Sequence, residues 1–226
     1  IKTATSYSDL ASAELVVEAI IEDLAIKEKV FAGLDAAVNK EAILASNTSS
    51  IWITKIAAAT QRPDKVLNLH FYATVWERPM VDVQRGTRTS DETFEAGRQF
   101  VRSIDCTPLL VLQESTGFVF NRVWRAVKRE CLHLVDDGVA SFEDVDRAWM
   151  IFNGAPLGPF GLMDMIGLDV IRDIEQVYYN ESDEERDAPP ALVLEKIERG
   201  ELGVKTGKGF YEYPNPAFED PSWLKG

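Results

Sequence analysis

The sequence predicts an α/β domain followed by an all-α domain. In the first half of the 226-residue chain, short apolar runs alternate with segments that have helical periodicity. From residue 114 on, only helical periodicity recurs. Strands that alternate with helices are typical of a doubly wound parallel sheet, which helices cover on both faces. We therefore expect one domain over residues 1–113 and a second over residues 114–226.

Five short apolar runs are the predicted strands of the first domain. They are bounded by polar or turn-forming residues, as buried strands are. The runs cover residues 14–20, 42–46, 66–72, 80–84 and 108–112. Apolar residues at helical spacing fall between them and predict helices over residues 24–38, 53–59 and 94–104. Ser90 and the acids Asp91 and Glu92 suit the amino-terminal end of the last of these helices.

The second domain carries helical periodicity without strand-like runs. Its predicted helices cover residues 120–135, 145–152, 168–177 and 191–199. Gly138 and Gly200 are suitable helix stops, and Ser141 with Asp144 is similar to a capping box. We expect a turn at residues 156–160 and a charged loop at residues 181–190.

Charge and composition exclude several classes of function. The chain has 24 Lys and Arg residues against 37 Asp and Glu residues, a net charge of −13, and such a chain repels phosphate backbones. No apolar run approaches the roughly 20 residues that span a bilayer. Cys106 and Cys131 have no metal-ligand spacing and cannot form a disulfide framework. We therefore expect a cytoplasmic protein without a nucleic-acid, membrane or metal partner.

The two histidines of the chain lie in different surroundings. His133 lies inside an apolar-faced helix, which favours a structural role. His70 ends a predicted strand, where functional groups of open α/β sheets emerge. A loop over residues 73–79 would bring Asp82, on the next strand, within reach of the imidazole and leave the other ring nitrogen free as a general base. The alternatives are a structural histidine and a polar position on an edge strand.

Two further polar groups are candidates for the same site. Residues 46–50 are Ser-Asn-Thr-Ser-Ser and follow a predicted strand, so that Ser49 lies where that strand leaves the sheet. Asn121 lies near the start of an otherwise apolar-faced helix. Ser49 or Ser50 could instead cap the following helix, and Asn121 could cap its own helix or face solvent. The residues by themselves leave these alternatives open.

The sequence contains no glycine-rich dinucleotide motif. A dinucleotide-binding sheet of this class begins with a strand, a glycine-rich phosphate-binding turn and a helix. No G-x-G-x-x-G occurs, and the glycines within residues 203–209 lie in the last part of the chain and precede no helix-like segment. Three interpretations stay open: such a unit was removed, it lies outside this chain, or the domain is of another kind.

Six short motifs follow one another between residues 15 and 213. They are LVVEAI at 15–20, ASNTSS at 45–50, LHF at 69–71, GFVFNR at 117–122, GPF at 158–160 and KTGKGFY at 205–211. In this order, they resemble the L-3-hydroxyacyl-CoA dehydrogenase family, 3-hydroxybutyryl-CoA dehydrogenases included. The resemblance implies a partial NAD-binding Rossmann domain, without its amino-terminal glycine-rich part, over residues 1–113. It implies a helical substrate-binding and dimerisation domain over residues 114–226, and hence a homodimer.

The resemblance also implies a reaction and the residues that carry it. The reaction is NAD-dependent oxidation of a 3-hydroxyacyl-CoA to the 3-ketoacyl-CoA, in fatty-acid metabolism. His70 matches the general base and Asp82 its acidic partner, while Ser49 and Asn121 match residues that bind the reacting oxygen and the substrate. The positions that match NAD contacts are Ala19, Ile20, Glu22, Lys27, Ser49, Ala73 and Lys205.

Several residues depart from the family pattern. Asp82 stands where the family has glutamate, and Ala73 and Thr74 stand where it has Asn-Pro. Arg78 adds a cation beside the predicted base, and a guanidinium can bind a free carboxylate with two hydrogen bonds. These departures leave two alternatives: a dehydrogenase of a small free hydroxy acid or diketone on the same fold, and a non-catalytic dimeric homologue.

Overall fold

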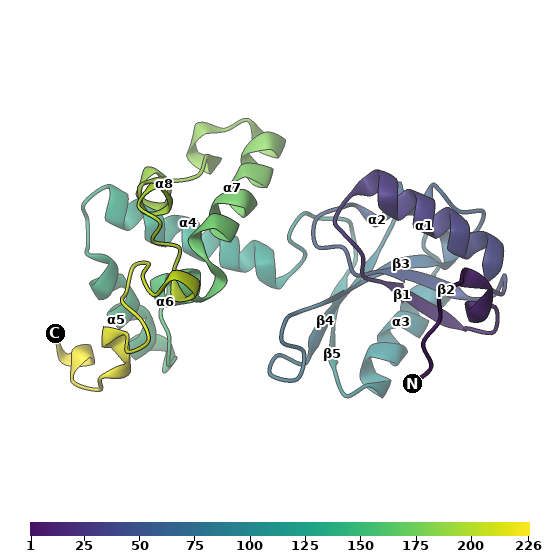
Figure 1. Cartoon of the computed structure of the whole chain (residues 1–226), viewed down its shortest axis with the longest axis horizontal. Helices are drawn as coiled ribbons and strands as arrows, with labels where there is room; N and C mark the ends of the chain where they lie inside the picture. The colour runs from purple at the N-terminus through teal and green to yellow at the C-terminus, as the bar shows by residue number, and fades with distance from the viewer. The chain divides into compact units, whose positions relative to one another are not determined.

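The computed structural model describes residues 1–226, and the chain divides into two compact units. The first unit is Ile1–Val123 and the second is Trp124–Gly226. The first contains every strand of the sheet, and the second is built from helices (Figure 1). Helix α4 (Phe120–Asp136) begins in the first unit and continues into the second.

One five-stranded sheet forms the centre of the first unit. Its strands lie in the order of the sequence: β1 (Leu15–Glu18), β2 (Ile43–Ser46), β3 (Val66–Phe71), β4 (Met80–Arg85) and β5 (Thr107–Val111). Strands β1, β2 and β3 run parallel to one another, and β5 runs parallel to β4. The predicted parallel sheet is therefore confirmed for every neighbouring pair except β3 and β4.

Strand β4 runs antiparallel to β3, which differs from the predicted wholly parallel sheet. The connection between them, residues 72–79, contains no helix. A parallel return needs a crossover of about a dozen residues or more, so this loop sends the chain back antiparallel. As a result, the amino end of β4 lies at the same edge of the sheet as the carboxyl ends of β1, β2 and β3, and His70 pairs directly with Asp82.

Helices cover both faces of this sheet, as the sequence predicts (Figure 1). Helices α1 (Leu24–Ala37) and α2 (Ile53–Ala57) pack on one face, and α3 (Asp91–Ser103) packs on the other. Because side chains alternate along a strand, Leu44 joins the first apolar cluster and Ala45 the second. Gly97 lets α3 approach the sheet closely, since a Cβ there would clash with Cδ1 of Leu67.

Five helices make up the second unit. They are α4, α5 (Phe142–Asn153), α6 (Pro159–Ile166), α7 (Leu168–Ser182) and α8 (Ala191–Glu198). Short 3₁₀ turns complete the chain at Tyr7–Leu10, Pro63–Lys65, Glu185–Asp187, Val204–Thr206, Ala217–Glu219 and Trp223–Lys225. Phe160, Met163 and Phe210 lie in the core of this unit. None of the helices has the length and apolar character that a bilayer crossing requires.

The segment predicted as a turn at residues 156–160 instead leads into α6. Pro159 occupies the first helical position, where its missing N–H costs nothing. The carboxylate of Asp146 accepts hydrogen bonds from the backbone N–H groups of Phe160, at 2.8 Å, and Gly161, at 3.0 Å. The cap thus comes from a different helix, α5, and the local sequence pattern does not reveal it.

Candidate active site

His70 lies near the carboxyl end of β3 with a polar group at each ring nitrogen. Its Nδ1 lies 3.3 Å from Oδ2 of Asp82, its partner across the β3–β4 pair. Its Nε2 lies 3.3 Å from Oγ of Ser49. The histidine side chain is buried, whereas Ser49 is exposed. The structure therefore places the imidazole between a buried carboxylate and a hydroxyl that solvent can reach.

The carboxylate of Asp82 has a second partner that the motifs do not indicate. Oη of Tyr72 donates a hydrogen bond of 2.5 Å to the same Oδ2 atom, and Oδ1 has no hydrogen-bond partner. Burial, followed by the hydrogen bond to Asp82 and its charge, raises the pKa of Tyr72 above the ordinary range. Residues two apart on a strand share a face, and this alternation was the available signal that Tyr72 lies beside His70.

The turn that carries Ser49 is held by the carboxylate of Glu22. Oε1 of Glu22 accepts hydrogen bonds from Oγ1 of Thr48 at 2.5 Å and from the backbone N–H groups of Ser49 and Ser50, each at 2.9 Å. Burial alone would raise the pKa of Glu22, but the hydrogen bonds from Thr48 and Ser50 outweigh it and lower this pKa. Glu22, which follows β1, thereby fixes the turn that follows β2.

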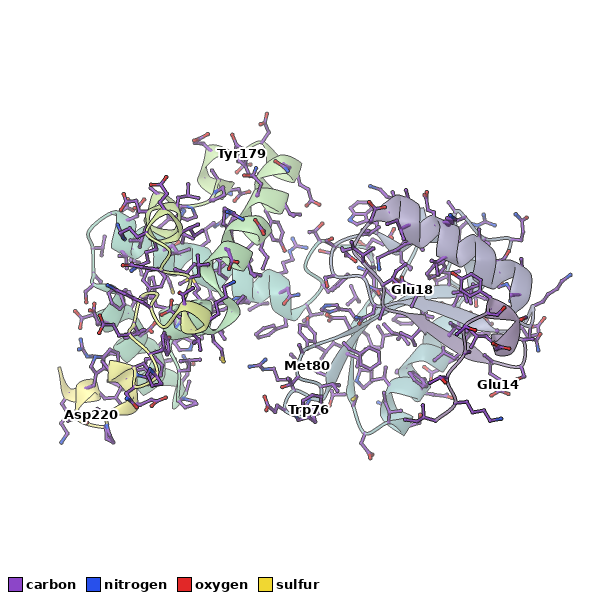
Figure 2. All side chains as sticks on the ribbon, in the orientation of Figure 1. Glu14, Glu18, Trp76, Met80, Tyr179 and Asp220 are labelled. Atoms are coloured by element: carbon purple, nitrogen blue, oxygen red, sulfur yellow. The ribbon has the colours of Figure 1, made fainter.

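Lys27 takes part in a buried ion pair at the end of β1. Its Nζ lies 2.8 Å from Oε1 of Glu18, and the lysine side chain is 1% exposed. Glu18, labelled in Figure 2, also accepts hydrogen bonds from the backbone N–H of Ile20 at 2.6 Å and from Oγ of Ser46 at 2.7 Å. In this arrangement, Lys27 supports the carboxyl ends of β1 and β2 from within the protein.

The other predicted site residues lie in four places. Ala19 and Ile20 are exposed directly after β1, and Ala73 is exposed after Tyr72. Asn121 lies in the first turn of α4. Lys205 belongs to the second unit and forms an ion pair with Asp169 there.

The site so described collects side chains at one edge of the sheet. Ser49, His70 and Glu22 follow or end the parallel strands β1, β2 and β3, and Asp82 comes from the amino end of β4. Ligands of open α/β sheets bind outside the carboxyl ends of the strands. These residues also fit the nicotinamide and ribose of a dinucleotide. Exposed Ile20 offers an apolar surface, and the carboxylate of Glu22 can accept hydrogen bonds from hydroxyl groups.

The arrangement of Asp82, His70 and Ser49 can support proton transfer. A carboxylate at Nδ1 fixes the Nδ1–H tautomer and stabilises the imidazolium form. Nε2 is then free to accept a proton from a hydroxyl group at the sheet edge. No group of three or more His, Cys, Asp or Glu side chains is arranged to hold a metal ion.

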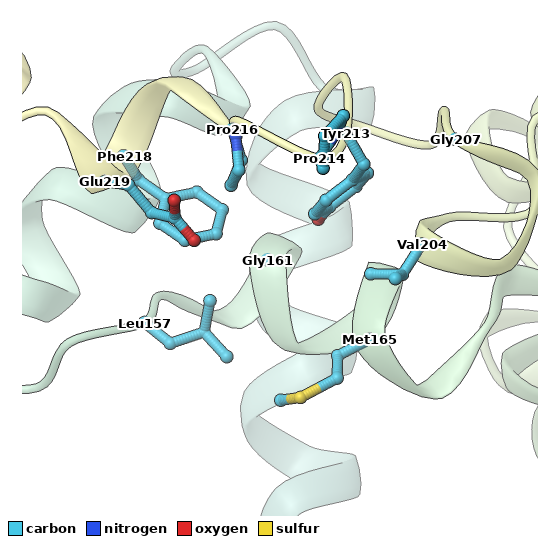
Figure 3. Close-up of a pocket in the computed structure, with 10 residues that line it drawn as sticks. All are labelled: Leu157, Gly161, Met165, Val204, Gly207, Tyr213, Pro214, Pro216, Phe218 and Glu219. Atoms are coloured by element: carbon cyan, nitrogen blue, oxygen red, sulfur yellow. The ribbon is translucent and has the colours of Figure 1, made fainter.

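A separate hollow of about 560 Å³ lies in the second unit (Figure 3). Apolar side chains such as Leu157, Met165 and Phe218 line it, and Glu219 lies at its border. None of the predicted site residues borders it.

Two protein-family models match consecutive parts of the chain. The model described as "3-hydroxyacyl-CoA dehydrogenase, NAD binding domain" matches residues 1–115. The model described as "3-hydroxyacyl-CoA dehydrogenase, C-terminal domain" matches residues 117–213. Together they account for most of the chain.

Curated proteins and solved structures agree with these models. The chain is 40% identical over 213 residues to a 3-hydroxybutyryl-CoA dehydrogenase of Clostridioides difficile, covering 94% of this chain and 75% of that protein. A solved (S)-3-hydroxybutyryl-CoA dehydrogenase of Ralstonia eutropha superposes with a TM-score of 0.86 at 37% identity, over 94% of this chain and 75% of that one. A solved diketoreductase superposes with a TM-score of 0.82 at 30% identity, over 92% of this chain and 72% of that one.

Proposed function

The chain belongs to the 3-hydroxyacyl-CoA dehydrogenase family, and from this membership we propose that it oxidises a 3-hydroxyacyl-CoA to the 3-ketoacyl-CoA with NAD. The observation that carries the proposal is the imidazole of His70, which lies 3.3 Å from Asp82 on one side and 3.3 Å from Ser49 on the other. An oxidation of this kind belongs to fatty-acid metabolism.

His70 serves as the general base in the proposed reaction. The substrate hydroxyl gives its proton to Nε2 of His70, and the C–H bond beside it gives up a hydride as the carbonyl forms. Bound NAD supplies the hydride acceptor. Asp82 stabilises the resulting imidazolium, and Oγ of Ser49 donates a hydrogen bond to the oxygen on which charge develops. Positioned proton transfer of this kind contributes about 10²–10⁴-fold in rate.

The same edge of the sheet provides the proposed cofactor contacts. Ala19, Ile20 and Ala73 offer exposed backbone and apolar surface, and Glu22 and Ser49 offer hydrogen-bonding groups. Lys27 contributes through its ion pair with Glu18, which holds the end of β1 in place. Asn121 is a further proposed substrate contact, and Lys205 is a further proposed NAD contact.

A homodimer in the cytoplasm is a further part of the proposal. The second unit exposes large apolar side chains that a partner subunit would cover: Val139 is 68% exposed, Ile151 62% and Phe152 90%. We place the division of roles at residue 113, with cofactor binding in residues 1–113 and substrate binding and dimerisation in residues 114–226. Sedimentation of the purified protein tests the dimer, and replacing Phe152 with Asp should weaken it.

An assay of substrate class tests the proposed reaction. Purified protein with NADH is offered acetoacetyl-CoA and, separately, free keto acids of matching chain length. We expect NADH oxidation with acetoacetyl-CoA. Activity on the free acids without activity on the CoA ester would contradict the proposal.

A second candidate function is the reduction of a diketone or the oxidation of a free hydroxy acid. The structural similarity to a diketoreductase favours it, together with the loop between β3 and β4. Arg78 in this loop donates one hydrogen bond of 2.8 Å to the backbone oxygen of Ala73 and is otherwise exposed. Trp76 of the same loop is 78% exposed (Figure 2). Under this alternative, Arg78→Ala would raise KM for a free acid and leave KM for a CoA ester unchanged.

A further inference from the structure

The hydroxyl of Tyr72 lies where three parts of the site meet. It donates a hydrogen bond of 2.5 Å to Oδ2 of Asp82, the atom that also faces Nδ1 of His70. The phenol ring packs edge-on against the ring of Phe120 at the start of α4, with 5.8 Å between ring centroids. The phenol ring also packs edge-on against the imidazole, with 4.7 Å between ring centroids. Tyr72 therefore touches the carboxylate, the imidazole and the helix that carries Asn121.

We propose that Tyr72 is a positioning residue that lowers the basicity of His70 by binding the carboxylate of Asp82. This inference rests on the proposed role of His70 as general base. Tyr72 has no part in the proton transfer itself, because the Nε2 atom that accepts the proton lies on the other side of the ring, next to Ser49.

The distances show which partner holds the carboxylate more closely. A charge-assisted bond between a ring N–H and a carboxylate is about 2.7–2.9 Å long, but Nδ1 of His70 lies 3.3 Å from Asp82. The phenol of Tyr72 approaches the same oxygen atom to 2.5 Å. A hydrogen bond donated to a carboxylate stabilises its charge, so the shared oxygen is a weaker acceptor for the imidazolium.

The direction of the phenol proton follows from the chemistry of its partner. The carboxylate of Asp82 can only accept a hydrogen bond, so the hydroxyl proton of Tyr72 points toward Oδ2 of Asp82. Asp82 is fully buried, and its Oδ1 atom has no hydrogen-bond partner. Removing the phenol hydroxyl would thus leave the imidazole as the one hydrogen-bonding partner of this carboxylate.

Few groups other than Asp82 and Tyr72 contact His70 and could change its basicity. Asp82 faces the ring from β4, and Tyr72, which directly follows β3, packs against it. The turn after β2 contributes the hydroxyl of Ser49, and the segment before α4 contributes the ring of Phe118, 5.0 Å from the imidazole. Neither Ser49 nor Phe118 carries a charge at neutral pH, and the charged Glu22 binds the turn that carries Ser49, so Asp82 is the charged side chain that is hydrogen-bonded to His70.

The histidine resonances give a direct test that needs no substrate. NMR titration of histidine-labelled protein reports His70 and His133, the two histidines of the chain, in one experiment. In Tyr72→Phe, the titration midpoint of His70 should rise by about one pH unit, and that of His133 should stay unchanged. Tyr7→Phe removes an exposed phenol hydroxyl from the same unit and is the matched control. An unchanged His70 midpoint in a folded Tyr72→Phe protein would overturn the proposal.

A second pair of variants isolates the route through the carboxylate. In an Asp82→Asn background, adding Tyr72→Phe should leave the midpoint of His70 where it was, because the charge that Tyr72 modulates is gone. A shift of equal size in both backgrounds would contradict the proposed route. If Tyr72→Phe does not fold, the NMR signal of the Tyr72 hydroxyl proton in the wild-type protein is the test. This proton should resonate downfield and exchange slowly with solvent, and rapid exchange would overturn the proposal.

The kinetic consequence distinguishes this inference from the proposed function. In Tyr72→Phe, the acidic limb of the pH profile of kcat/KM should move upward by the same amount as the NMR midpoint. If His70→Ala keeps full activity, the proposed role of His70 as general base fails while the NMR result still stands. If His70→Ala is inactive and the midpoint does not move, the role of Tyr72 fails and the proposed function stands.

Discussion

Glu22 accepts a hydrogen bond of 2.9 Å from the backbone N–H of Ser49, so the residue after β1 fixes the hydroxyl that faces His70. The same carboxylate oxygen also binds Thr48 and Ser50. Three segments that are distant in the sequence are thereby joined at one edge of the sheet. Hydrogen bonds to a charged acceptor are worth about 1.5–3 kcal/mol each, which makes this turn well ordered before a ligand binds.

Glu22→Ala should loosen the turn that carries Ser49. Without the carboxylate, two backbone N–H groups and two hydroxyls lose their acceptor, and Ser49 moves away from the imidazole. A misplaced group near the reaction costs up to about 100-fold, so kcat/KM should fall by about 10- to 100-fold. Steady-state kinetics measure the effect, with Glu14→Ala as the control because Glu14 is an exposed acid ahead of β1 (Figure 2). Wild-type kcat/KM in Glu22→Ala would show that Glu22 does not position the turn.

Breaking one buried ion pair on one side should destabilise the second unit. Nζ of Lys128 lies 2.5 Å from Oε1 of Glu175, and their side chains are 1% and 3% exposed. Burial lowers the pKa of Lys128, although the charge of Glu175 works against this shift. Removing one partner of a buried pair leaves an uncompensated charge, so Glu175→Gln should destabilise the protein by about 3–5 kcal/mol.

A double variant shows whether the loss of stability comes from the unpaired buried charge of Lys128. Lys128→Met combined with Glu175→Gln removes both charges and should recover most of the lost stability. Arg186→Ala breaks an exposed ion pair with Glu184 and should change the free energy of unfolding by less than about 1 kcal/mol. Urea unfolding of the three variants makes the comparison. Equal losses in the single and double variants would mean that the charge pairing contributes little.

Asp146 should make the second unit less stable as the pH rises. Burial raises the pKa of Asp146 to about 6 in the folded protein, although the N–H groups of Phe160 and Gly161 favour its charged form. The unfolded pKa is about 3.9, so the folded protein binds the proton more tightly. The stabilising contribution is therefore complete below about pH 4 and is lost as the pH rises through about 6.

The pH dependence of unfolding measures this contribution. Between about pH 4 and pH 7, the wild-type protein should lose about 3 kcal/mol relative to Asp146→Asn, which has no titrating group at this position. Asp146→Asn is less stable at every pH, because its amide replaces one acceptor oxygen, so the slope is the informative quantity. Parallel pH profiles for the two proteins would contradict the raised pKa.

The alternation of apolar runs and helical segments predicted most of the first unit, because each element there is defined by its own periodicity. The antiparallel direction of β4 follows from the short loop between β3 and β4. The alternation of strands and helices does not by itself indicate the direction of that strand. The start of α6 was missed for a different reason: its capping carboxylate, Asp146, belongs to the preceding helix. Contacts between distant segments carry no local signal.

The same division holds for the site. His70, Asp82 and Ser49 were expected together from strand ends and motifs, and the structure brings them together. The sequence does not predict the hydrogen bond from Tyr72 to Asp82 or the hydrogen bonds from the Ser49 turn to Glu22. These contacts depend on which side chains face one another after folding. Lys27 matches a predicted cofactor position. Its burial beside Glu18 results from the packing of α1 on the sheet, which the sequence pattern does not show.

The kcat values of His70→Ala and His133→Ala test most directly the claim that His70 is the general base. The purified wild-type, His70→Ala and His133→Ala proteins are compared with acetoacetyl-CoA and NADH, and circular dichroism verifies that each is folded. We expect His70→Ala to lower kcat by about 10²–10⁴-fold and His133→Ala to keep wild-type activity. Wild-type kcat in a folded His70→Ala protein would show that this imidazole is not the base.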